Sequence, residues 1–246
     1  MIGVGVGTPG GGAIAPTPLT ILGGLLVGWW NADSASKITV TGSGVSSWKD
    51  EIGGYDLTQA TDAARPTWSP TSFNGRAGVT FDGVDDFLRL NATPGTFPVG
   101  NASSEIWIAG AQDQDKNLTA ATTAFGYGSG STATRLVRRT VTSADNRAGL
   151  NAQGTSTINT SGIWLGRHLV RACFVDAACT PHFDGVAGPV GGQSLATVSG
   201  NVTAGATTAA SANGFFGGTL HQVLVLGGTP SSQAIAELNA LLIARL

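Results

Sequence analysis

Residues 78–90 read Gly-Val-Thr-Phe-Asp-Gly-Val-Asp-Asp-Phe-Leu-Arg-Leu, which is a polar turn between two apolar segments. An Asp-Gly pair between apolar segments is a strong turn signal, because Gly accepts positive φ and Asp hydrogen-bonds to nearby backbone. We therefore expect a tight turn between two strands, in which Asp82 and Gly83 have structural roles.

The rest of the chain is typical of an all-β protein. Short apolar segments alternate with clusters of Gly, Asn, Asp, Ser and Thr, which indicates many short strands in a sandwich or barrel. The expected strands cover residues 25–30, 38–40, 79–82, 87–90, 106–111, 136–141, 169–175, 182–184 and 220–226. Since all-β sandwiches often reach this length as one domain, we expect a single domain over residues 21–246.

The two ends of the chain depart from this pattern. Residues 1–20 are rich in Gly and Pro and have no periodic apolar face, so we expect an extended arm. Residues 231–244 carry an apolar stripe at helical spacing, which predicts a helix docked on the sandwich, with Thr229 as its cap and Pro230 in the first helical position. The stripe consists of Ile235, Leu238, Leu241 and Leu242.

Several spaced motifs resemble laminin-G-like domains, which have the concanavalin A-like lectin/glucanase fold. Besides residues 78–90, these motifs are Gly28-Trp29-Trp30-Asn31-Ala32-Asp33, Val45-Ser46-Ser47-Trp48-Lys49-Asp50, Asp56-Leu57-Thr58-Gln59-Ala60-Thr61 and Phe215-Phe216-Gly217-Gly218-Thr219-Leu220. The resemblance implies an all-β, two-sheet antiparallel jelly-roll sandwich closed by a C-terminal helix. Domains of this kind usually recognise glycans or proteins.

Composition and charge exclude some classes of partner. Charged residues make up 11% of the chain and the formal net charge is −2, so the chain offers no basic field to a nucleic acid. No apolar run of 18 or more residues is present, which argues against a membrane span. The N-terminus lacks the basic segment of a secretory signal peptide, so we expect synthesis in a host cytoplasm.

The sequence lacks the common catalytic motifs. Glucanases that share this fold use a Glu-x-Asp-x-x-Glu strand, whereas none of Glu51, Glu105 and Glu237 has an Asp two residues later. No Gly-x-Ser-x-Gly elbow and no paired metal-binding spacing occurs. We therefore expect no enzyme activity, although an inverting pair drawn from the twelve Asp residues stays open.

Two tryptophans and two arginines are the candidate ligand-binding residues. Trp68 and Trp164 lie next to Pro, Ser or Gly, so we expect their rings at the surface, where aromatic rings stack on sugars. Arg138 and Arg139 belong to an arginine cluster over residues 135–147. This cluster indicates either a contact for an acidic glycan or partner, or a solvated face of a strand.

Acidic residues in the signature turn are candidate calcium ligands. Asp82, Asp85 and Asp86 crowd hard oxygen atoms into one loop, and Asp113 with Asp115 forms a second candidate. The alternative is that Asp82 and Asp86 brace the turn through hydrogen bonds to the backbone. No other cofactor is expected.

Cys173 and Cys179 are the two cysteines of the chain, and they flank an expected hairpin tip. A turn centred on Asp176 would place the two thiols opposite each other, within reach of a disulfide. A cytosolic origin favours free thiols instead.

These observations favour a non-enzymatic structural or adhesion component of a virus particle. Laminin-G-like domains also occur in the head-decoration and tail-fibre proteins of bacteriophages. Residues 1–20 would attach to other virion proteins, in a homo-oligomer, while the sandwich faces outward and binds a glycan. The alternatives are a glycan-cleaving enzyme or a free carbohydrate-binding module of the same fold.

Overall fold

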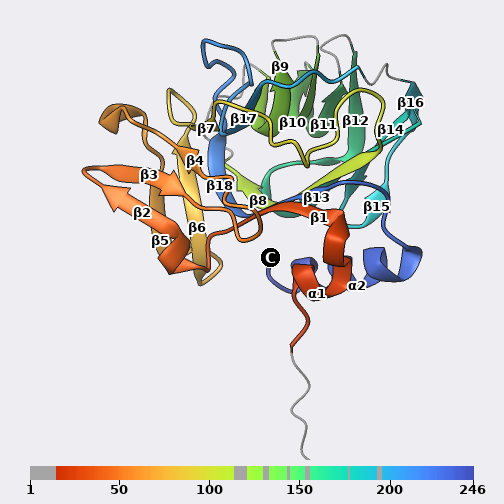
Figure 1. The fold of residues 1–246 in the computed structure, drawn as a ribbon, viewed down its shortest axis with the longest axis horizontal. Coiled ribbons are helices and arrows are strands. Elements are labelled where there is room, and N and C mark those ends of the chain that lie inside the picture. The colour runs from red at the N-terminus through yellow and green to blue at the C-terminus, as the bar shows by residue number, and fades with distance from the viewer. Residues whose placement is uncertain are drawn as a thin grey trace, which may run out of the picture.

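The computed structural model describes residues 15–113, 121–129, 133–142, 145–152, 156–176, 178–192 and 196–246. Two antiparallel sheets of nine strands each, named A and B here, pack face to face. The prediction of an all-β, two-sheet antiparallel sandwich with a C-terminal helix is confirmed. Figure 1 shows the strands of sheet B (β9 to β12 and β17) in one layer and those of sheet A (β1, β8, β13 and β18) in the other.

The strands of each sheet come from distant parts of the chain. Sheet A has the order β15 (Val186–Ala187), β14 (Ala178–Phe183), β13 (Gly166–Val175), β8 (Ser104–Gln112), β18 (Gly217–Leu226), β6 (Arg76–Asp82) and β5 (Thr67–Phe73), with β1 (Leu26–Asn31) paired to β18 and β16 (Gly191–Gly192) paired to β14. Sheet B has the order β12 (Ser156–Ile163), β11 (Asp145–Ala152), β10 (Ala133–Thr142), β9 (Thr122–Ser129), β17 (Asn201–Ala204), β7 (Leu88–Leu90), β4 (Leu57–Thr58), β3 (Gly44–Trp48) and β2 (Ile38–Thr41).

Alternation along the strands builds one core between the sheets. Side chains that point inward are fully buried, whereas their neighbours in the sequence face outward. The inward residues include Val79 and Phe81 of β6, Phe125 and Tyr127 of β9, and Val223 and Val225 of β18.

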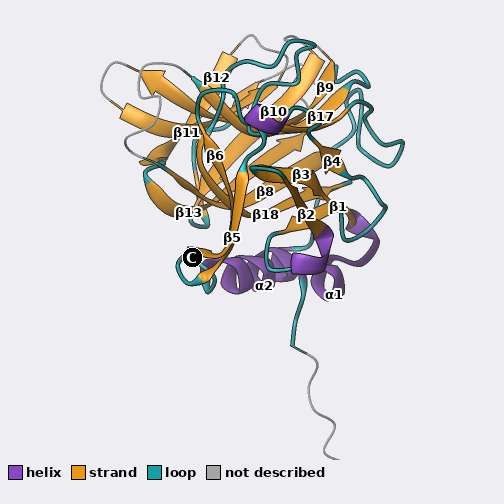
Figure 2. Ribbon diagram, turned by 90° about the vertical axis from the view of Figure 1, so that its left-hand side faces the viewer, coloured by secondary structure: helices purple, strands orange, loops and turns teal. Residues whose placement is uncertain are grey.

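A second apolar layer covers the outer face of sheet A. Here α1 (Pro18–Leu22) and α2 (Ser232–Ile243) pack Leu22, Leu238 and Leu242 against Trp107 and Leu224. Figures 1 and 2 show both helices on this side of the sandwich. The short 3-10 turns are η1 (Gly23–Leu25), η2 (Ala35–Lys37) and η3 (Asp62–Ala64). None of the helices in the described part of the chain is long and apolar enough to span a membrane.

The structure corrects two predictions for the ends of the chain: the cap of the C-terminal helix and the extent of the N-terminal arm. Helix α2 confirms the predicted helix, but its cap is Ser231, whose hydroxyl accepts the amide hydrogen of Ala234, and not Thr229. The cap and the first helical residue therefore lie two residues later than expected, since α2 begins at Ser232. Residues 18–20, expected as extended, begin α1, because the Thr17 hydroxyl accepts the amide hydrogen of Thr20. Residues 1–14 lie outside the described part.

The signature turn connects the two sheets. It leaves sheet A at Asp82 and enters sheet B at Leu88, so the two strands are not partners in a hairpin. Asp82 Oδ1 accepts amide hydrogens from Val84, Asp85 and Asp86, over 2.8–3.3 Å. Gly83 has φ of 79°, the left-handed conformation that glycine adopts readily. The turn therefore has the structural role predicted for Asp82 and Gly83.

The two cysteines do not form a disulfide. In the β13–β14 hairpin Val175 pairs with Ala178, so Cys179 stands opposite Phe174 and not opposite Cys173. Because side chains alternate between the faces of a sheet, Cys179 lies in the core and Cys173 faces outward. Both cysteines are free thiols.

Candidate functional site

The outer face of sheet B carries a row of polar side chains. The residues that precede its members in the sequence, such as Leu57, Leu88 and Val202, point into the core. The polar side chains therefore face away from the core. Cross-strand pairing places the row in one line over five strands: Thr39, Ser47, Thr58, Arg89 and the fully buried Thr203. The helices α1 and α2 pack on the outer face of sheet A and not on this face.

Arg89 is the charged centre of this row. Its guanidinium lies 5.0 Å from the centroid of the Phe87 ring. The same group donates to the carbonyl oxygens of Thr207, Ala209 and Ala210 over 2.9–3.2 Å, and thereby holds the segment that follows β17. Burial lowers the pKa of Arg89 from its usual value.

Phe87 and Phe215 form a half-buried aromatic pair at the end of this face. Their ring centroids are 6.4 Å apart and the ring planes are tilted by 38°. Phe216 enters the core, so its neighbour Phe215 turns outward. An isolated bridge pairs Phe215 with Thr123 of β9, which places the aromatic pair between β7 and β9. We name Phe87, Arg89, Thr123 and Phe215 the aromatic rim.

The backbone at Phe87 is fixed by a neighbouring loop. The Phe87 amide donates to Ala64 O over 3.2 Å, and Gln59 Nε2 donates to Phe87 O over 3.1 Å. Arg65 Nε in turn donates to Gln59 O over 3.0 Å. These contacts hold Phe87 at the rim without using its side chain.

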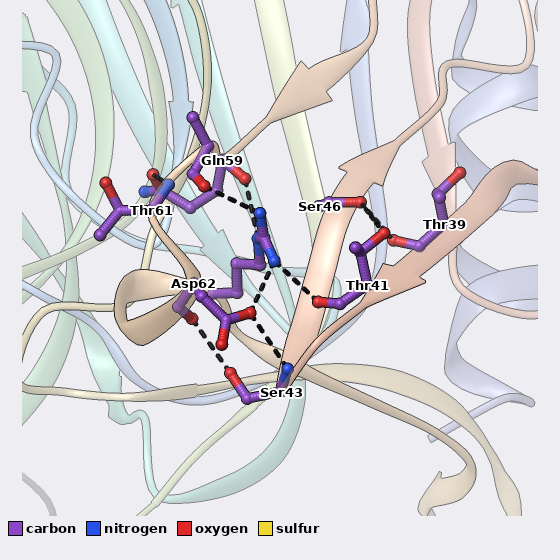
Figure 3. Close-up of polar contacts among 9 residues, drawn as sticks. Thr39, Thr41, Ser43, Ser46, Gln59, Thr61 and Asp62 are labelled. Atoms are coloured by element: carbon purple, nitrogen blue, oxygen red, sulfur yellow. Dashed lines mark hydrogen bonds and ion pairs between the residues drawn. The ribbon is translucent and has the colours of Figure 1, made fainter.

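A polar network supports this loop from the β2–β3 turn. Figure 3 shows the Asp62 carboxylate beside Ser43, whose backbone amide donates to Asp62 Oδ1 over 3.1 Å. The guanidinium of Arg65 lies 2.6 Å from the same oxygen. Arg65 also donates to Thr41 O over 2.8 Å. The Ser43 amide, followed by the nearby Arg65 charge, lowers the pKa of Asp62.

The acidic residues of the signature turn adjoin the rim. Oxygen atoms of Asp82, Asp85 and Asp86 all lie within 4.8 Å of one another. Asp85 is exposed, whereas Asp86 is buried and accepts the amide hydrogen of Asp82 over 2.9 Å. The chemistry of this oxygen set fits a hard cation such as Ca²⁺, although Asp82 already accepts three backbone amides. Of the second calcium candidate, Asp113 is exposed, and Asp115 lies outside the described residues.

The structure does not place the predicted tryptophans in one site. Trp164 is fully buried with its ring 5.5 Å from that of Phe216, so the prediction that it is exposed is wrong. The nearby Gly and Ser residues belong to strands β12 and β13, and Trp164 between these strands packs into the core. Trp68 is half-buried and donates to Ala32 O over 3.1 Å in sheet A, away from the aromatic rim.

Of the predicted arginines, Arg138 lies beside the rim. Its partner in the β9–β10 ladder is Thr123. The side chain of Arg139 lies outside the described part of the structure. Arg135 points inward and is fully buried, where it donates to Thr197 Oγ1 over 3.0 Å and to Ala102 O over 2.7 Å.

Sequence reasoning missed the aromatic rim, although one signal for it was present. Phe87 and Arg89 alternate with Leu88 and Leu90, which predicts that Phe87 and Arg89 share the face opposite the core. No comparable signal marks Thr123 or Phe215, because the contacts that bring them to Phe87 span more than 30 residues of sequence.

Comparisons with known proteins identify the fold alone. No family model matches the sequence, and no curated protein matches it significantly. Among solved structures, an arabinofuranosidase complexed with arabinofuranosyl-α-1,2-xylobiose matches with TM-score 0.62 and 14% identity, over 82% of this chain and 51% of that one. The chain thus spans about half the length of this relative.

Two further structures extend the comparison. Domain 4 of AbnA, a GH43 extracellular arabinanase from Geobacillus stearothermophilus, in complex with arabinotriose, matches with TM-score 0.60 and 13% identity, over 87% of this chain and 98% of that one. Trypanosoma rangeli sialidase in complex with sialic acid matches with TM-score 0.60 and 13% identity, over 87% of this chain and 32% of that one.

These relatives correct the functional expectations from the sequence. The predictions of a non-enzymatic protein and of a virion component are contradicted, because the structures that share this fold belong to glycosidases with carbohydrate ligands. The comparisons give no link to bacteriophage head-decoration or tail-fibre proteins. They favour the alternative that was left open, a protein that binds or cleaves glycans.

Proposed function

We propose that this chain is a glycan-recognition domain that binds a carbohydrate chain at the aromatic rim. The observation that carries the proposal is the pair of half-buried rings of Phe87 and Phe215 on the outer face of sheet B, 6.4 Å apart. Rings that keep one face accessible supply apolar area for sugar rings, while fixed polar groups beside them orient hydroxyls.

The surroundings of the two rings support this proposal. Arg89 and the exposed Thr58 are neighbours in the polar row. The Thr58 hydroxyl donates to Arg89 O over 3.3 Å, and its oxygen can still accept a hydrogen bond from a ligand. The backbone contacts of Phe87 and the carbonyls bound by Arg89 fix the rim before any ligand arrives. Such preorganisation lowers the entropy cost of binding. The carbohydrate ligands of the structural relatives support the same class of ligand.

A binding panel with one aromatic substitution tests the proposal. Calorimetric titration of arabinotriose, arabinoxylan and xylan oligosaccharides, oligogalacturonides and sialyllactose would be run on the wild type and on Phe215→Ala. We expect at least one saccharide to bind the wild type, and Phe215→Ala to weaken its Kd roughly tenfold, since an aromatic contact of about 1.4 kcal/mol corresponds to that factor.

The matched control is Tyr55→Ala, which removes another half-buried aromatic side chain that contacts Phe97 and lies in a loop outside the rim. Binding should survive in this variant. Loss of binding in both variants to the same extent, or no binding to any saccharide by the wild type, would overturn the proposal.

Glycoside cleavage at the same place is a second candidate. The carboxylates of Asp85 and Asp86 lie within 4.8 Å of each other beside Phe87, close to the separation of about 5–5.5 Å that retaining glycosidases use. Asp85 is exposed and could reach a substrate, whereas Asp86 is buried.

The test of cleavage is turnover of 4-nitrophenyl glycosides and of the saccharides in the panel. Asp85→Asn should abolish turnover while binding to the rim persists. Turnover that is unchanged in Asp85→Asn and in Asp86→Asn would remove this pair from consideration as the catalytic groups.

A further inference from the structure

Five arginines with described side chains have acceptors that satisfy their charge. Arg65, Arg76 and Arg171 each form an ion pair with a carboxylate, and Arg89 and Arg135 donate to several carbonyl or hydroxyl oxygens. These contacts are what a partly or fully buried guanidinium requires, because burial without a partner is costly.

Arg138 is different from these arginines. Its side chain is partly buried on the outer face of sheet B, opposite Thr123. Its Nε atom is buried and has no hydrogen-bond partner among the described residues. Burial lowers the pKa of Arg138, and no carboxylate in the described part of the chain offsets this effect.

The residue opposite Arg138 also has an unpartnered polar atom. Thr123 of β9 has a buried hydroxyl without a hydrogen-bond partner among the described residues. This hydroxyl can donate or accept a hydrogen bond, whereas the guanidinium can only donate. At this corner of sheet B the Nε of Arg138 therefore has no described acceptor, and a negatively charged acceptor would suit it best.

This corner is continuous with the aromatic rim. Thr123 pairs with Arg138 on one side and with Phe215 on the other. Two strand spacings therefore separate Arg138 from Phe215, a backbone distance of roughly 10 Å. One ligand lying across the strands can contact both residues.

We propose that the ligand of the aromatic rim is an acidic glycan, whose carboxylate or sulfate group binds to Arg138. This inference rests on the proposed function, because it assigns the charge of the ligand that the rim binds. A planar guanidinium binds a carboxylate or a sulfate through two parallel N–H donors, and such charge-assisted bonds are the stronger ones. The anion supplies an acceptor that the described residues do not offer to the Nε of Arg138.

The competing explanation is that Arg138 has only a covering role. Long side chains often lay their apolar stem over a hydrophobic surface and leave the charge in water, and Leu136 lies two residues away on the same face. In that case the charge of Arg138 contributes nothing to recognition, and a neutral side chain of similar length serves equally well.

The experiment compares acidic saccharides with their neutral counterparts. An oligogalacturonide and its carboxyl-reduced form, and a κ-carrageenan oligosaccharide and its desulfated form, would be titrated into the wild type, Arg138→Gln and Arg167→Gln. Arg167 is an exposed arginine of sheet A, so its substitution makes the same change in net charge on the other sheet.

We expect the wild type to bind one acidic form roughly tenfold or more tightly than its neutral form, with an affinity that falls as NaCl is raised. Arg138→Gln should abolish this preference and leave binding of the neutral form unchanged. Arg167→Gln should keep the preference. A preference in the oligogalacturonide pair assigns a carboxylate, and one in the carrageenan pair assigns a sulfate.

Two results would overturn the inference. One is equal binding of acidic and neutral forms by the wild type, which leaves the proposed function standing if Phe215→Ala still weakens both. The other is a preference that persists in Arg138→Gln. If none of the saccharides binds, the proposed function and this inference both fail.

Discussion

The carboxylate of Glu105 is held by the guanidinium of Arg171 on the outer face of sheet A, with Oε1 and Nη2 2.5 Å apart. Glu105 is completely buried and Arg171 nearly so. Trp107 completes the cluster, since its Nε1 donates to Glu105 Oε2 over 2.8 Å and its ring lies 4.9 Å from the guanidinium. The pair thus joins neighbouring strands β8 and β13 under a cover of apolar side chains.

Removing one partner of this pair should be costly. Arg171→Met leaves the Glu105 charge buried without its cation, and we expect a loss of about 3–5 kcal/mol in the free energy of unfolding. The double variant Glu105→Gln with Arg171→Met should recover much of this loss, because no unpaired charge remains. Urea denaturation of the three proteins measures both values, and equal losses in the single and double variants would contradict the explanation.

Thr123→Val should stabilise the protein. The Thr123 hydroxyl is buried and has no hydrogen-bond partner in the described part of the chain, so replacing it with a methyl group of similar shape removes an unsatisfied polar atom. We expect a gain of about 1 kcal/mol in the free energy of unfolding. Ser104→Ala is the control with the opposite expected result. The buried Ser104 hydroxyl accepts hydrogen bonds from Tyr127 and Arg135, so its loss should destabilise the protein. A lower melting temperature for Thr123→Val would mean that its hydroxyl has a partner.

Stability should fall in mild acid because of His221. Burial, the largest effect, lowers the pKa of His221. Its ring stacks on Phe73, and its Nδ1 lies 2.8 Å from Ala77 O. Asp33, Arg76 and Arg245 are the charged groups around it. Because the unfolded state takes up a proton near pH 6.5 and the folded state does so only at lower pH, stability is full above pH 6.5 and declines as the pH falls below it.

The variant His221→Asn checks this assignment, because it keeps a donor for Ala77 O and removes the titrating ring. Urea denaturation between pH 8 and pH 5 should show a shallower loss of stability in the variant than in the wild type. An identical pH dependence would assign the effect to other groups, among them His182, whose pKa burial also lowers.

Asp82 should stabilise the signature turn without a metal. Asp82→Ala deprives the amides of Val84, Asp85 and Asp86 of their acceptor, and we expect a loss of about 1–2 kcal/mol. Melting curves with Ca²⁺ and with EDTA distinguish the two roles proposed for this turn. A wild-type midpoint that rises with Ca²⁺, and does so neither in Asp82→Ala nor in Asp85→Ala, would show that the acidic residues bind the ion.

The fold was predictable from the sequence where local patterns are strong. Strands such as β8 and β18 are long and apolar, and α2 has a clear stripe, so each was expected at nearly its observed position. Strand β9 was missed, because Gly126 and Gly128 interrupt its pattern. The structure explains Gly126, since a Cβ at this position would lie 2.2 Å from the Leu136 side chain of the next strand. That constraint comes from the partner strand and leaves no local signal.

The candidate site was less predictable, for a related reason. The local sequence around Trp164 suggests an exposed turn, yet Phe216, more than 50 residues later, covers its ring. Arg138 was recognised as a candidate because it belongs to the arginine cluster over residues 135–147, and the structure places it opposite Thr123 of the rim. Phe87 and Phe215 come into contact only in the folded sandwich, because they are far apart in the sequence. The local periodicity of the sequence therefore does not predict their contact.

The free thiols of Cys173 and Cys179 can report separately on opening of the two sides of the β13–β14 hairpin. Burial, the largest effect in each case, raises the pKa of Cys173 to about 11 and that of Cys179 to about 12, so neither thiol reacts readily while the structure stays closed. Cys173 faces the helix-covered side of sheet A and Cys179 faces the core. Timed labelling with a thiol reagent, each cysteine studied with the other replaced by Ser, therefore distinguishes local exposure of one side of the hairpin from separation of the two sheets.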